Sequence, residues 1–145
     1  MQSIFEMPVP SEIDVYYDDS KRPVRCASLA DVDAALDKLH REAYATRRPL
    51  AVAIKLFGHE IDTGVGADPT FLCLQIAPCD GEYYVAVGEQ TVGEPTMFYG
   101  AGQDSYWEPK NMIPAEVSRS AVRYFIEHQK RSPRVRWQDW DGRDV

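Results

Sequence analysis

The chain has 145 residues, of which 44% are hydrophobic and 27% charged, and its formal net charge is −7. This composition predicts one globular domain over residues 1–145 and excludes a disordered or fibrous chain. No apolar run approaches the roughly 18 residues that a membrane span requires, and the first ten residues lack the basic start and apolar core of a signal peptide. We therefore expect a cytoplasmic protein.

The first expected elements are a strand and an amphipathic helix. Residues 13–18 are rich in β-forming side chains and predict a short strand. Ser28 is expected to begin a helix, because its hydroxyl can cap the first turn and Asp31 follows three residues later. This helix is expected to end near Arg47. Its apolar residues recur at helical spacing and form one stripe, made of Leu29, Val32, Leu36, Leu39 and Ala43.

The centre of the chain predicts several strands joined by short turns. Alternating or β-forming residues indicate strands at 50–56, 71–76, 82–87 and 96–99. Residues 78–81 and 92–95 contain the proline, glycine and acidic residues of tight turns. We expect loops at 58–69 and 103–112.

A second helix and a last strand complete the expected fold. Pro114 suits the first turn of a helix, Val117, Ala121 and Phe125 follow at helical spacing, and Pro133 ends it. Residues 135–140 predict a short strand. The order β-α-β-β-β-β-α-β, with one apolar stripe on each helix, predicts an α+β fold in which a single antiparallel meander sheet carries both helices on one face. The other face of the sheet would remain open for function.

Side chains capable of catalysis are few and scattered. His59, Glu60 and Asp62 are the closest approach to a catalytic or metal-binding group, and they keep open an alternative, a small hydrolase-like enzyme that uses this loop. The chain contains no HExxH, GxSxG or Walker motif. Three cysteines, Cys26, Cys73 and Cys79, form no CxxC pair and are expected to be reduced. We expect no catalytic activity, no cofactor and no bound metal.

The charges are unevenly distributed along the chain. No Lys or Arg lies between Leu56 and Pro109, whereas nine acidic residues do. Such a block repels nucleic acid and anionic membranes and attracts a basic protein surface, and aromatic residues carry much of the binding energy at protein interfaces. We therefore predict no direct binding to nucleic acid or membrane. The predicted protein-binding residues are Asp80, Glu82, Glu89, Glu94, Tyr99, Asp104, Tyr106 and Trp107.

Several motifs, taken in order, resemble the Imm1 family of immunity proteins from bacterial polymorphic toxin systems. The resemblance covers roughly residues 13–140. Its motifs are GVGADPTFL at 64–72, GEYYVAVG at 81–88, FYG at 98–100, Ile113-Pro114 before a helix that leads to Phe125, and PRVRW at 133–137.

The resemblance implies an α+β protein, encoded beside a toxin, that binds this toxin and occludes its active site. The toxin would present a basic surface to the inhibitor. Toxins paired with the family include ones that act on nucleic acids, notably deaminases of double-stranded DNA, so a deaminase or a nuclease is the expected partner. The family supplies no catalytic residues, and its contact residues vary with the toxin, so the predicted binding residues rest on charge and exposure alone.

Overall fold

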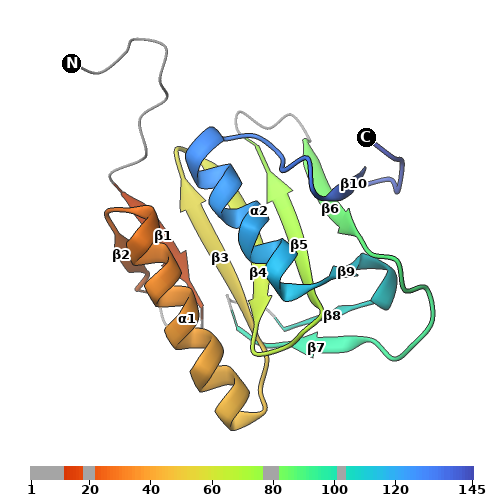
Figure 1. Ribbon diagram of the computed structural model, residues 1–145, viewed down its shortest axis with the longest axis horizontal. Coiled ribbons are helices and arrows are strands. Elements are labelled where there is room, and N and C mark those ends of the chain that lie inside the picture. Colours follow the sequence, from red (N-terminus) through yellow and green to blue (C-terminus); the bar gives the residue numbers. More distant parts are fainter. Residues whose placement is uncertain (1–11, 18–21, 77–81, 101–103) are drawn as a thin grey trace.

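The computed structural model describes residues 12–17, 22–76, 82–100 and 104–145. The predicted turn at 78–81, with Cys79 and the candidate Asp80, lies outside the described residues. Two helices, α1 (Leu29–Thr46) and α2 (Ala115–His128), lie side by side across one face of a sheet (Figure 1).

The main sheet is antiparallel between all neighbouring strands. Its order is β10-β6-β5-β4-β3-β1-β2, and the short strand β9 (Met112–Ile113) pairs with the free part of β5. The strands are β1 (Ile13–Tyr16), β2 (Val24–Cys26), β3 (Leu50–Leu56), β4 (His59–Val65), β5 (Thr70–Gln75), β6 (Tyr83–Val87) and β10 (Arg136–Asp139). The predicted α+β class, with an antiparallel meander and both helices on one face, is confirmed.

The main core fills the space between the helices and the sheet. Leu36 of α1, Phe125 of α2 and Ile54 of β3 are fully buried in it. The predicted cap of α1 is present, since the Asp31 N–H donates to the Ser28 hydroxyl at 3.1 Å and the Ala27 N–H donates to the Asp31 carboxylate at 3.0 Å. The helix ends near Arg47, as predicted. Arg47 is its C-cap and adopts the left-handed conformation.

The segment 58–69 was expected to be a loop, and this expectation is wrong. Residues 59–65 form β4, which lies in the middle of the sheet between β3 and β5. A two-residue turn of Phe57 and Gly58 joins β3 to β4, both with positive φ, as tight antiparallel hairpins require. Phe57 is an unusual residue for that conformation, and the polar side chains of β4 hide its strand pattern.

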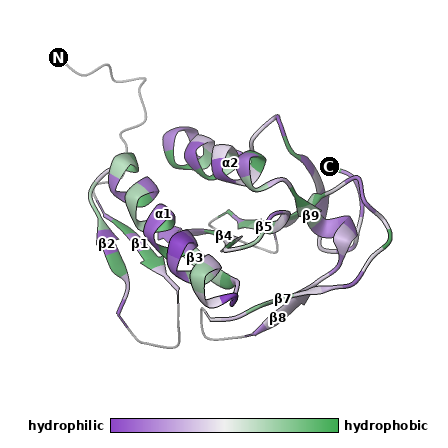
Figure 2. Cartoon of the chain, turned by 60° about the horizontal axis from the view of Figure 1, so that its bottom comes forward, coloured by the Kyte–Doolittle hydropathy of each residue, from purple (hydrophilic) through white to green (hydrophobic). Residues whose placement is uncertain are grey.

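A second, smaller sheet lies on the other side of the main one. The strand predicted at 96–99 appears as β7 (Thr96–Phe98), which pairs with β8 (Ser105–Trp107) from the segment expected to be a loop. The short helix η1 (Pro109–Asn111) follows. Figure 2 shows the β7–β8 hairpin and the helices on opposite sides of the main sheet.

Replacing Leu36 with alanine tests the packing of α1 on the sheet. Leu36 is completely buried, so the Leu36→Ala variant should lose about 2–5 kcal/mol of unfolding free energy. The exposed Lys38 on the same helix provides a control, because Lys38→Ala should change stability by less than about 0.5 kcal/mol. Chemical denaturation measures both. Equal stability of the two variants would contradict the packing described.

Candidate functional site

The β7–β8 hairpin covers one end of the sheet face that the helices leave open. Phe98 is fully buried and meets Phe71 edge to face, with ring centroids 5.0 Å apart. Trp107 stacks flat on the same Phe71 ring at 4.5 Å. These rings form a second, small core with Met112 and Val85. The hairpin is therefore fixed to the sheet by its inward side chains, and its other side faces outward.

The outward side of the hairpin carries aromatic and acidic side chains. Alternation along β7 and β8 turns the paired residues Met97 and Tyr106 away from the sheet, and Tyr106 is 69% exposed. Asp104 and Glu108, at the two ends of β8, are also exposed, and Tyr99 is half-buried. We define the hairpin surface as Met97, Tyr99, Asp104, Tyr106 and Glu108. Three predicted binding residues, Tyr99, Asp104 and Tyr106, belong to it.

The other predicted residues lie elsewhere. Trp107 faces inward against Phe71, so it holds the hairpin in place. Glu89 and Glu94 are exposed on the connection between β6 and β7. Glu82 is exposed just before β6, and the six residues from there to Gly88 span roughly 20 Å of extended chain. The predicted residues are therefore spread over two ends of the molecule.

The part of the open face that the hairpin does not cover carries a cluster of polar side chains. The distribution of charge along the sequence does not reveal this cluster. The strand registers align Lys55 with Glu60, Asp62 with Cys73, and Gln75 with Tyr83. The Lys55 ammonium lies 3.5 Å from the Glu60 carboxylate and 4.9 Å from the centre of the Tyr16 ring. Trp140 is 72% exposed and meets Tyr83 edge to face at 4.9 Å. We define the sheet patch by its members, Tyr16, Lys55, Glu60, Asp62, Tyr83 and Trp140.

Asp62 is the most perturbed acid of this patch. Burial raises its pKa to about 8, and the charge of Glu60 and a hydrogen bond with Glu60 act in the same direction, whereas Lys55 opposes them. Its Oδ1 atom is buried and has no hydrogen-bond partner among the described residues. Burial also raises the pKa of Cys73 and of Tyr83. Solvent access to the middle of the open face is therefore limited, although several polar side chains lie there.

The strand geometry separates the three residues of the enzyme alternative. His59 lies on the helix face, where its ring meets Phe125 at 5.6 Å. Glu60 and Asp62 lie on the opposite face, because Glu60 contacts Lys55 and Asp62 aligns with Cys73. The His59 ring and the two carboxyl groups therefore do not converge on one substrate position. Among the described residues, no three His, Cys, Asp or Glu side chains are grouped so as to hold a metal ion.

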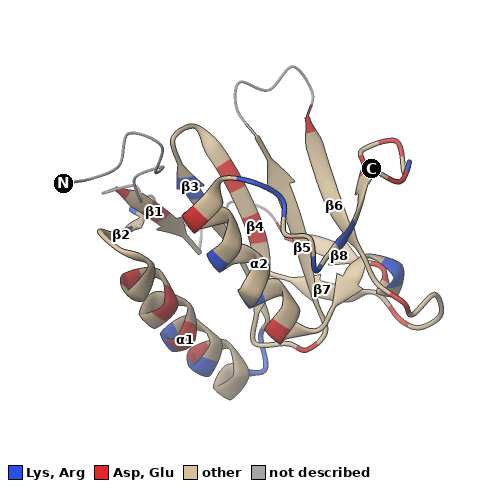
Figure 3. Ribbon diagram, turned by 45° about the horizontal axis from the view of Figure 1, so that its top comes forward, with Lys and Arg blue, Asp and Glu red and all other residues tan. Residues whose placement is uncertain are grey.

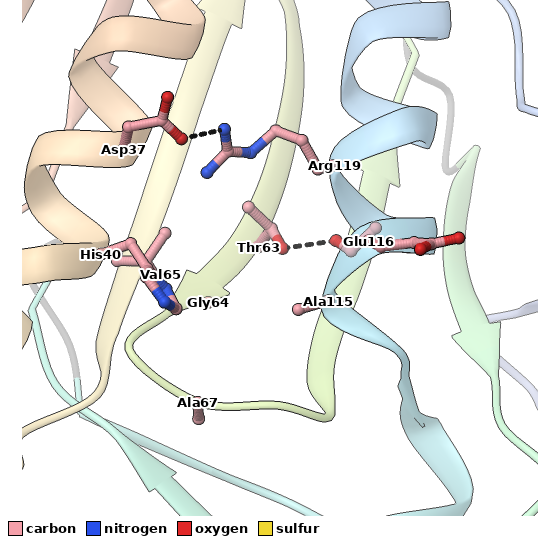
Figure 4. Close-up of a pocket in the computed structure, with 10 residues that line it drawn as sticks. Asp37, His40, Thr63, Gly64, Val65, Ala67, Ala115, Glu116 and Arg119 are labelled. Atoms are coloured by element: carbon pink, nitrogen blue, oxygen red, sulfur yellow. Dashed lines mark hydrogen bonds and ion pairs between the residues drawn. The ribbon is translucent and has the colours of Figure 1, made fainter. Parts of the chain in front are cut away.

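A small pocket of about 240 Å³ lies between the two helices. Figure 4 shows Arg119 of α2 pointing across it to Asp37 of α1, at 2.7 Å, and the hydroxyls of Thr63 and Ser118 lie 2.6 Å apart. Arg119 and Arg123 also contact Asp33. The charged residues seen on the two helices in Figure 3 thus pair with each other in part. The polar groups named here join the helices to each other and to the sheet.

A wider cleft of about 1030 Å³ lies beside the start of α2. It is lined by acids and bases alike, among them Glu89, Lys110 and Arg136. The hairpin surface carries two exposed acids, and beside them the Arg48 guanidinium lies 3.9 Å from the centre of the Tyr99 ring. No described helix is long and apolar enough to span a membrane.

Exposed aromatic side chains on the open side of a helix-backed antiparallel sheet are suited to binding another protein, and the exposed acids beside them attract a basic partner. The model of the family described as immunity protein Imm1 matches residues 20–139, and the chain therefore belongs to the Imm1 family. None of the curated proteins matches the chain. Membership implies an immunity protein for a toxin, a cognate toxin as its partner and a non-enzymatic role.

Replacing Asp62 with asparagine tests the electrostatics of the sheet patch. The folded protein keeps a proton on Asp62 up to about pH 8, whereas the unfolded chain releases it near the ordinary value of about 3.9. The presence of Asp62 therefore lowers stability as the pH rises through this window. The Asp62→Asn variant should melt at a higher temperature than the parent, by a margin that grows between about pH 5 and about pH 8.

Asp37 provides a control of opposite sign. A hydrogen bond from Arg119 lowers the pKa of Asp37, so Asp37→Asn should bring no gain in melting temperature at the upper end of this window. Thermal melts at several pH values measure both variants. A gain for Asp62→Asn that is the same at every pH would refute the raised pKa.

Proposed function

We propose that this protein neutralises a toxin that acts on nucleic acid, a deaminase or a nuclease, in the cytoplasm of the cell that produces it. It would do so by covering the basic active-site surface of the toxin with the hairpin surface. The observation that carries the proposal is the outward side of the hairpin, where an exposed tyrosine stands among acids in a segment without Lys or Arg. Membership of the Imm1 family supports it.

The chemistry of the substrate supports an acidic inhibitor. An enzyme that acts on DNA or RNA needs a basic surface around its active site, because phosphate contacts supply much of the affinity for nucleic acid. A folded acidic surface competes for the same positions and accelerates association through long-range attraction. Buried aromatic side chains then slow dissociation.

The candidate residues divide into parts with different tasks. Tyr99, Asp104 and Tyr106 would form the centre of the contact, and Trp107 would support them from below. Glu89 and Glu94, on the connection that leads into the hairpin, would extend the acidic surface at its border. Glu82, at the far end of β6, would contact only a toxin large enough to reach along the whole strand, and Asp80 lies outside the described residues.

Two variants of the hairpin surface separate long-range attraction from anchoring at contact. The double variant Asp104→Lys/Glu108→Lys should associate more slowly with the toxin domain encoded by the neighbouring gene, and its binding should depend less on salt. Tyr106→Ala should mainly speed dissociation and weaken binding by about tenfold or more. Surface-immobilised binding kinetics at low and high salt measure both effects.

Matched controls come from the helices, on the other side of the sheet. Glu42→Lys/Glu127→Lys changes the net charge equally at exposed positions, and Tyr44→Ala removes a tyrosine that is 72% exposed. These controls should bind as the parent does. If the controls weaken binding while the hairpin variants do not, the toxin contacts the helices and the proposed surface is wrong.

A further inference from the structure

Asp62 lies on the open face of the main sheet, beside the β7–β8 hairpin. Gly64 lies directly under the hairpin, since a Cβ atom there would collide with the Phe98 ring. Asp62 precedes Gly64 by two residues on the same strand, a distance of about 7 Å. It therefore lies at the foot of the hairpin, on the middle strand of the main sheet. Central positions of an interface are where binding energy concentrates.

No positively charged side chain among the described residues forms an ion pair with Asp62. The nearest ammonium, that of Lys55, contacts Glu60 and lies over the Tyr16 ring. Across the strands Asp62 aligns with Ala53 and Cys73, neither of which is a cation. Its buried Oδ1 atom accepts no hydrogen bond from any described residue. An unsatisfied buried acceptor is unfavourable. The Asp62 side chain is partly exposed, so its rotation would present this oxygen to a donor from a binding partner and remove that penalty.

The aromatic neighbours indicate which donor fits. Tyr83 contacts Trp140, most of whose indole is exposed. A guanidinium group is planar, binds carboxylates through two parallel hydrogen bonds and stacks on aromatic rings. An ammonium group is a compact, strongly hydrated charge that gains less from such surroundings. A carboxyl pair near the half-buried Tyr83, which in turn contacts the exposed Trp140, therefore favours arginine over lysine.

We infer that the sheet patch receives an arginine side chain of the toxin, which binds the carboxyl groups of Glu60 and Asp62 beside Tyr83 and Trp140. This inference rests on the proposed function and specifies the partner group at the centre of the contact. The arginine would come from the basic surface with which the toxin holds nucleic acid. Its capture by the patch would withdraw one cation from that surface.

Binding of the arginine releases a proton. The raised pKa keeps Asp62 protonated below about pH 8 in the free protein, and a guanidinium beside it favours the carboxylate. The carboxyl proton passes to the buffer as the ion pair forms. Affinity should therefore increase as the pH rises towards 8 and level off above it. Among the described residues, the titratable groups on this face around Asp62 are Tyr16, Lys55, Glu60, Cys73 and Tyr83, with Asp14 and its partner Arg25 farther out beyond Lys55.

Isothermal titration calorimetry with the toxin domain encoded by the neighbouring gene tests the inference. Measurements in two buffers with different ionisation enthalpies, below pH 8, give the number of protons released. The parent should release a proton that the Asp62→Asn variant does not, and the variant should bind about tenfold or more weakly near pH 8. Asp37→Asn, the same chemical change on α1, should match the parent in both readouts.

The outcomes separate this inference from the proposed function. The Asp62→Asn variant is expected to be at least as stable as the parent, so weaker binding by this variant reports the contact rather than unfolding. If hairpin variants weaken binding but Asp62→Asn binds with parental affinity and proton release, the arginine contact is wrong and the proposed function stands. If the parent does not bind the toxin domain, both are wrong.

Discussion

The packing of Phe98 and Trp107 against Phe71 determines which side chains the open face of the sheet presents for contact. It attaches a two-stranded hairpin to a surface that would otherwise be flat, and it does so with inward rings only, so that the outward side chains are free for contact. Gly64 is necessary to this arrangement, because any side chain at that position would collide with Phe98. The stack also sets the border at which the uncovered part of the sheet begins, directly beside Asp62.

A protonated carboxyl group in the middle of a sheet, with one oxygen that accepts no hydrogen bond from a described residue, lowers the stability of the fold. Burial disfavours its charged form, and a neutral amide of the same shape would avoid that penalty. A binding surface gains from the same feature, because the penalty disappears only when a partner supplies a suitable donor. Weak intrinsic stability at this position and selectivity for a partner thus have the same physical origin.

The sequence was a good guide where one pattern dominated. The apolar stripes of α1 and α2 and the Ser28 cap predicted both helices and the face they cover. It failed at β4, because the Phe57-Gly58 turn carries no familiar turn pair, and because polar side chains on this strand resemble a loop. The alignment of Asp62 with Cys73, and its neighbours Glu60 and Lys55, exist only after β4 is paired on both sides. The distribution of charge along the sequence revealed the acidic segment, but it did not show which of its acids lie close together in the fold.

The two parts of the surface differ in the range over which they act. Exposed acids on the hairpin attract a basic partner from a distance, and salt screens that attraction because water surrounds them. Asp62 acts only at contact, since its neutral form produces no long-range field, and its burial protects it from screening. Attraction by the hairpin would therefore bring many basic proteins near the surface, whereas only one with an arginine at the right place would satisfy Asp62. Selection of one toxin over other basic proteins would then depend on the buried acid rather than on the total charge.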